Sequence, residues 1–97
     1  MMLKKVWPQE ASLGNLVKKK YENGQLAVYF QSEEGEQLAE LSIKDDRIEL
    51  KEDEIILKDY SENSLVIDVM VSEEKLIPTD RYILVGNHLC PICKVSV

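Results

Sequence analysis

The chain has 97 residues, of which 44% are hydrophobic and 31% are charged, and its net charge is −6. This length fits one domain, and the apolar content excludes intrinsic disorder. No apolar run approaches the roughly 18 residues of a membrane span, and no apolar stretch follows the first two lysines as a signal peptide requires. We therefore expect a cytoplasmic protein without membrane contact, whose two cysteines are reduced thiols.

The charge is unevenly distributed along the chain. Residues 1–20 carry five lysines and one glutamate, which gives +4, whereas residues 21–97 carry seven basic and seventeen acidic groups, which gives −10. Phosphate contacts need Lys and Arg, so nucleic-acid binding is disfavoured. The run Lys18-Lys19-Lys20 is the exception, and we interpret it as the solvated end of a strand.

In chain order, residues 1–12 are predicted to be a mobile N-terminal segment, and residues 13–97 a single domain. Trp7 in that segment either packs on the core or is exposed for a partner. Two strands, over about 16–21 and 26–30, are predicted to flank a two-residue hairpin turn at Asn23-Gly24, because a type I′ turn needs positive φ at both central residues.

The middle of the chain is predicted to consist of short strands. A turn at residues 33–36 precedes Ala39, Leu41 and Ile43, whose alternation with polar residues predicts one half-buried strand. A turn at 44–47, a short strand at 48–50, an acidic loop at 51–54 and a strand at 55–58 follow.

Residues 62–71 leave two interpretations open. Ser61 and Asn63 are residue types that cap helices, and the apolar residues that follow fall on one side of a short helix: Leu65, Val66, Val69 and Met70. The β-branched residues favour a strand instead. A strand over 81–85, a turn at 86–87 and an extended segment over 88–97 complete the chain, and Pro91 predicts an edge position for that last segment.

The predicted fold is therefore α+β. It comprises an antiparallel sheet of four to six strands with one short helix, at about residues 62–71, packed on one face. The alternation of Ala39, Leu41 and Ile43 predicts that the other face of the sheet is polar.

The block Lys58-Asp59-Tyr60-Ser61-Glu62-Asn63, together with Asn23-Gly24 and a terminal Pro91-x-Cys93, resembles a small bacterial family of unknown function. Its members are carried largely by Gram-positive bacteria and mobile elements. The resemblance covers about residues 21–97 and implies a sheet followed by a helix after Asn63. It carries no activity over to this chain.

His88, Cys90 and Cys93 form a His-x-Cys-x-x-Cys pattern, which offers three zinc ligands. Structural zinc is usually held by four Cys or His ligands, and the sequence has no second pair. We therefore interpret the cysteines as buried apolar residues and predict no metal and no cofactor; a small metal-binding domain is the alternative function. Without a visible catalytic constellation, we predict that the chain is not an enzyme.

Two acidic or polar stretches are the candidate binding residues. Asp45, Asp46, Asp53 and Glu54 lie in a dense acidic cluster, which is either a surface that docks on a basic protein or a solvated loop. Asp59, Tyr60 and Asn63 lie where the sheet is predicted to lead into the helix, and these side chains either bond to free backbone groups or bind a ligand. The resulting hypothesis is a protein-interaction domain, in its sharper form an acidic inhibitor of a basic host protein.

Overall fold

The computed structural model describes residues 14–60 and 63–97, so the predicted mobile segment and Trp7 lie outside the described residues. The described part contains these elements: β1 (Asn15–Lys20), β2 (Leu26–Gln31), β3 (Gln37–Glu40), β4 (Ser42–Ile43), β5 (Glu54–Leu57), α2 (Ser64–Ser72), β6 (Leu76–Val85) and β7 (His88–Val95).

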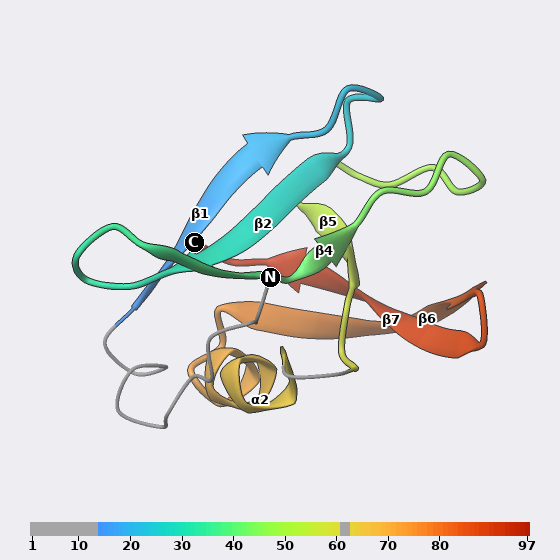
Figure 1. Cartoon of the computed structure of the whole chain (residues 1–97). Helices are drawn as coiled ribbons and strands as arrows, with labels where there is room; N and C mark the ends of the chain where they lie inside the picture. Colours follow the sequence, from blue (N-terminus) through green and yellow to red (C-terminus); the bar gives the residue numbers. More distant parts are fainter. Residues whose placement is uncertain (1–13, 61–62) are drawn as a thin grey trace.

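The strands form two antiparallel sheets (Figure 1). The first sheet has the order β1-β2-β3, and the second has the order β4-β5-β7-β6. The α+β class is confirmed, but the prediction of one sheet is wrong. The reason lies in the segment that joins the sheets.

That segment crosses from the first sheet to the second at a single residue, Leu41. Leu41 is completely buried, its amide donates to the Val28 carbonyl at 2.9 Å, and its carbonyl accepts from the Lys58 amide at 2.8 Å. The predicted continuous strand with a polar outer face is therefore wrong, since Ser42 is only 1% exposed. Both bonds extend the adjoining ladders in register: the Leu41 amide pairs next to the last β2–β3 pair, and its carbonyl pairs next to the first β4–β5 pair. Leu41 therefore ends one sheet and begins the other, and neither of its backbone groups is left unpaired.

The side chains of Tyr21 and Ser42 form hydrogen bonds beside this crossing. The Tyr21 hydroxyl lies 2.6 Å from Oε2 of Glu40 and 2.8 Å from Oγ of Ser42, and Oγ of Ser42 in turn accepts the Val28 amide at 2.8 Å. Burial and the Glu40 carboxylate raise the pKa of Tyr21 well above its ordinary value. The phenol therefore stays protonated and donates at the crossing.

The predicted hairpin between β1 and β2 is confirmed, but its loop has three residues instead of two. The Tyr21 amide donates to Gln25, and the Gly24 amide donates to the Tyr21 carbonyl, both at 2.9 Å. Gly24 has φ +88°, whereas Asn23 stays at negative φ. A type I turn followed by one left-handed residue closes such a loop, so one glycine is sufficient.

Two apolar cores lie on opposite faces of the second sheet. The main core lies between the two sheets and α2 and contains Val28, Phe30, Leu38, Leu41, Ile55, Leu57, Val66, Ile67, Met70, Leu76, Cys93 and Val95. The second core contains Ile56, Cys90 and Ile92, with Ile43, Ile48, Leu50, Tyr60, Ile83 and Val85 packed around them. The strand predicted at 48–50 is a loop, because Ile48 and Leu50 cover this second core.

Residues 64–72 form a helix, so the strand interpretation is wrong. Val66, Ile67 and Met70 are its buried residues, and their packing against both sheets outweighs the β-branched preference. Asn63 occupies the N-cap position but makes no side-chain cap bond. Its amide instead donates to the carbonyls of Glu40 at 2.9 Å and Lys58 at 3.1 Å. The predicted capping role of Asn63 is therefore wrong.

Strand β7 is an inner strand, which corrects the edge position predicted from Pro91. It pairs with β6 on one side and with β5 on the other. The β5 ladder reaches only as far as Ile56 opposite Ile92. Pro91 is tolerated because it stands immediately beyond the last pair with β5, where no ladder bond needs its missing amide.

Changing Asn63 to Asp tests its role at the crossing. Asp is a good N-cap and would be harmless if Asn63 acted as a cap. Here a carboxylate would face two carbonyl oxygens, and we expect Asn63→Asp to lower the free energy of unfolding by about 3 kcal/mol. Urea denaturation measures this, with the exposed Asn15→Asp as the matched control. Equal stability of the two variants would contradict the assignment.

Candidate functional site

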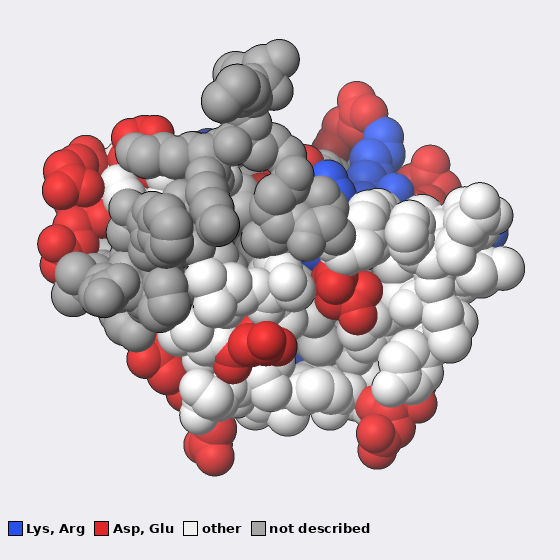
Figure 2. Space-filling model, turned by 60° about the horizontal axis from the view of Figure 1, so that its bottom comes forward, with Lys and Arg blue, Asp and Glu red and all other residues white. Residues whose placement is uncertain are grey.

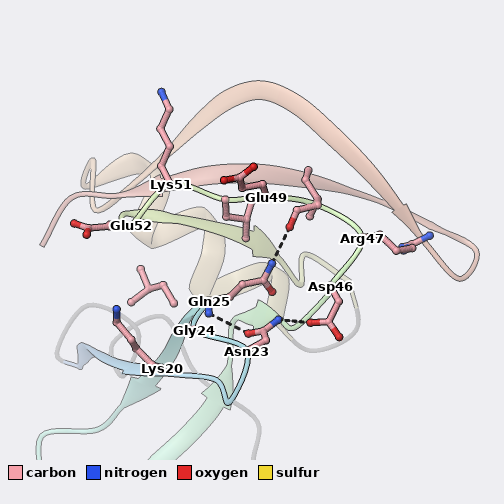
Figure 3. Close-up of a pocket in the computed structure, with 12 residues that line it drawn as sticks. Lys20, Asn23, Gly24, Gln25, Asp46, Arg47, Glu49, Lys51 and Glu52 are labelled. Atoms are coloured by element: carbon pink, nitrogen blue, oxygen red, sulfur yellow. Dashed lines mark hydrogen bonds between the residues drawn. The ribbon is translucent and has the colours of Figure 1, made fainter.

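An open depression of about 540 Å³ lies between the β1–β2 turn and the segment 46–52 (Figure 3). Its polar and charged lining residues are Lys20, Asn23, Gln25, Asp46, Arg47, Glu49, Lys51 and Glu52. The lining mixes three cations with three carboxylates. The described lining residues include no histidine, cysteine or serine, so they offer neither a hydroxyl or thiol nucleophile nor an imidazole base.

Gln25 fixes the geometry of this depression. Its side-chain amide donates to the carbonyls of Asp45 at 2.8 Å and Ile48 at 3.0 Å. Its side-chain oxygen accepts the Asp45 amide at 3.0 Å. Three bonds from one side chain thus tie the loop to the first hairpin, and the loop in turn covers the second core.

Each residue predicted in the acidic cluster has a partner within the chain. Asp45 accepts from the Arg47 guanidinium and amide, which holds the pKa of the carboxyl at about 2. Asp46 accepts from the Asn23 amide at 2.6 Å, Asp53 lies 3.7 Å from Lys94, and the buried Glu54 accepts from Arg81 at 2.8 Å. The four carboxylates do not converge on one site, and these contacts fold the loop.

The predicted junction residues are also separated from one another. Tyr60 stacks on His88, with ring centroids 3.9 Å apart and planes at 7°. Asn63 is buried at the crossing, whereas Asp59 is exposed. Only Asp59 of the three remains available to a partner as a charged group.

Cys90 and Cys93 project from opposite faces of β7, because residues three apart in a strand alternate in direction. Cys90 lies in the second core and Cys93 in the main core. Their Cα atoms are about 10 Å apart along the strand, whereas a zinc–sulfur bond is about 2.3 Å. Within residues 14–60 and 63–97, no three His, Cys, Asp or Glu side chains are grouped to hold a metal ion.

The sequence reasoning missed an exposed apolar surface on the β6–β7 hairpin. Tyr82, Leu84 and Leu89 are 57%, 56% and 62% exposed. Leu84 pairs with Leu89, and Tyr82 pairs with Pro91, so the three large side chains share one face, which we call the hairpin face. The hairpin projects to the right in Figure 1, and uncharged surface dominates the corresponding part of Figure 2. The continuous apolar run Tyr82-Ile83-Leu84-Val85 was the available signal, because it makes both faces of the strand apolar.

Comparisons of the sequence with protein-family models, with curated proteins and with solved structures found no match. In the part of the chain that the structure describes, no helix is long and apolar enough to cross a bilayer.

Removing the Gln25 side chain should loosen the loop over the second core. Each lost hydrogen bond contributes about 1 kcal/mol, so we expect Gln25→Ala to speed tryptic cleavage after Arg47 and Lys51 at least tenfold through local opening. Gln31→Ala is the control, because that side chain bonds to Gly35 in another loop. Unchanged cleavage rates would show that Gln25 does not hold the loop.

The Cys93 thiol should make stability depend on pH. Burial raises its pKa from 9.0 to about 11, so the unfolded chain loses the thiol proton first. The thiol's contribution is intact below pH 9 and is lost as the pH rises towards 11. Between pH 8 and pH 10, the wild type should lose about 1 kcal/mol more of its free energy of unfolding than Cys93→Ala. Parallel pH profiles of the two proteins in urea would disprove this.

Proposed function

We propose that the chain is a non-enzymatic protein-interaction domain that binds a basic partner through the hairpin face. The exposure of Tyr82, Leu84 and Leu89 on one side of the hairpin is the observation that carries the proposal. Large apolar side chains gathered on one face are typical of interaction sites, and Tyr is enriched among interface anchors.

The state of the reactive groups supports a role without catalysis. The ring of His88 is stacked on Tyr60, and burial raises the pKa of both Cys90 and Cys93. A nucleophilic cysteine needs the opposite shift, towards the thiolate at neutral pH.

The charge surrounding the hairpin face supports a basic partner. Asp59 and Asp80 are exposed and form no ion pair within the described residues. Of the cations beside the hairpin, Arg47 and Arg81 are bound to Asp45 and Glu54, and Lys58 lies over the Tyr60 ring. We therefore assign the acidic docking surface to the surroundings of the hairpin instead of the loop at 45–54. The form of this function that we favour is an inhibitor of a basic host protein.

A comparison of captured proteins tests the proposal. The immobilised wild type should retain a basic protein that the double variant Leu84→Ser/Leu89→Ser captures at least tenfold less, because two apolar anchors are lost. Both residues are exposed, so the free energy of unfolding should change by only about 0.5 kcal/mol.

The matched control is Asp46→Asn/Asp53→Asn, which removes two carboxylates from the loop. This variant should capture the same basic protein as the wild type. Undiminished capture by the hairpin variant would refute the assignment of the surface, and loss of capture in the loop variant alone would return the contact to the acidic cluster.

A further inference from the structure

The hairpin face continues the face of the second sheet that carries the main core. Cys93 and Val95 on β7 point into that core beside α2. Leu89 and Pro91 are separated from Cys93 and Val95 by even numbers of residues, so all four side chains lie on the same face of β7. Pro91 is half-buried and Leu89 is exposed, so the cover over this face ends along β7. The uncovered end is a core-like surface that the described residues leave open.

The neighbouring strand edge is closed to another strand. β6 is the outer strand of its sheet, but Pro78 and an irregularity between Pro78 and Arg81 interrupt it, with Asp80 at φ +66°. The Leu84 carbonyl is already bonded to Nη2 of Arg47 at 2.8 Å. Proline, a bulge and a charged side chain are devices that prevent strand addition. A partner therefore contacts the face of the hairpin and not its edge.

Acidic residues outnumber basic ones in the segment that leads to the hairpin. Residues 58–81 contain six acidic residues and three basic residues, Lys58, Lys75 and Arg81. Lys75 is paired with Glu73 at 3.3 Å, Arg81 is paired with Glu54, and Nζ of Lys58 lies 5.8 Å from the centre of the Tyr60 ring. Asp59, Asp68 and Asp80 form no ion pair within residues 14–60 and 63–97. Figure 2 shows acidic side chains at several places around the uncharged area, with the most prominent basic group near one edge.

We propose, building on the interaction function above, that the hairpin face binds an amphipathic basic helix of the partner protein. A helix satisfies its own backbone hydrogen bonds and needs no free strand edge. Its residues one turn apart are spaced by about 6 Å, which matches the roughly 7 Å between Tyr82 and Leu84. Lysines or arginines beside the apolar stripe would face Asp59, Asp68 and Asp80.

The probe is a labelled 14-residue peptide of leucine and lysine in helical periodicity, titrated against the full chain at physiological salt. A peptide of the same composition in strict alternation is the comparison, because it favours a strand. We expect at least tenfold tighter binding of the helical peptide, together with a gain of helical circular dichroism. Equal binding of both peptides, or no binding of the helical one, would overturn the proposal.

Variants locate the binding on the surface. Leu84→Ser/Leu89→Ser should weaken helical-peptide binding at least tenfold. Asp68→Asn/Asp80→Asn should weaken it several-fold and reduce its salt dependence, and Asn is suited to the positive φ of residue 80. Asp46→Asn/Asp53→Asn should leave it unchanged. Full binding by the leucine variant would overturn the proposal.

The outcomes separate this inference from the broader function. If the hairpin variant loses its captured basic protein while the helical peptide fails to bind, the interaction surface stands and the helical partner is wrong. If sedimentation shows a wild-type dimer that Leu84→Ser/Leu89→Ser abolishes, the occupant is a second copy of the chain, and the helix proposal is overturned.

Discussion

The crossing at Leu41 is the constraint on which the rest of the structure depends. A chain that leaves one sheet and enters another within one residue places polar backbone groups in an apolar interior, where each unpaired group costs about 1–3 kcal/mol. Val28 and Lys58 satisfy Leu41 itself, and Asn63 satisfies the carbonyls of Glu40, which precedes Leu41, and of Lys58, which pairs with it. The same bonds set where β4 begins and where α2 starts, so one polar network positions both sheets and the helix.

The second sheet is buried on both faces, and the two faces have different covers. The first sheet and α2 cover the face with Cys93, whereas the loop at 44–53 and Tyr60 cover the face with Cys90. The second cover reaches the end of the hairpin, because Tyr60 stacks on His88 and Arg47 reaches the Leu84 carbonyl. The hairpin face is exposed because the cover on the Cys93 side ends before the tip of the hairpin, whereas the cover on the Cys90 side reaches it.

Local signals predicted the parts of the fold that depend on local chemistry. The turn at Gly24 and the strands on either side of Gly86 follow from turn residues and apolar spacing, whereas the local signals left helix and strand open for residues 62–71 and packing decided for the helix. The division into two sheets could not be predicted, since the groups that satisfy Leu41 lie 13 and 17 residues away in sequence. The acidic cluster was predicted as a binding surface for the same reason. The sequence shows the charge of Glu54, but only the fold shows that Arg81, 27 residues later, is bound to it. The apolar run Tyr82-Ile83-Leu84-Val85 is typical of a strand buried on both faces, and the sequence does not show which of the two faces is exposed.

An exposed apolar surface on a rigid support is well suited to recognition. The inner side of the hairpin packs Ile83 and Val85 against the second core, so the outer residues are held in place before a partner arrives, and little ordering entropy is lost on binding. The same exposure would favour aggregation if the adjoining strand edge were open. Pro78, the irregularity that follows it and the Arg47 bond close that edge while leaving the face free. An open face beside a closed edge therefore allows side-chain recognition of a partner and disfavours the backbone pairing that would join copies of the chain into an extended sheet.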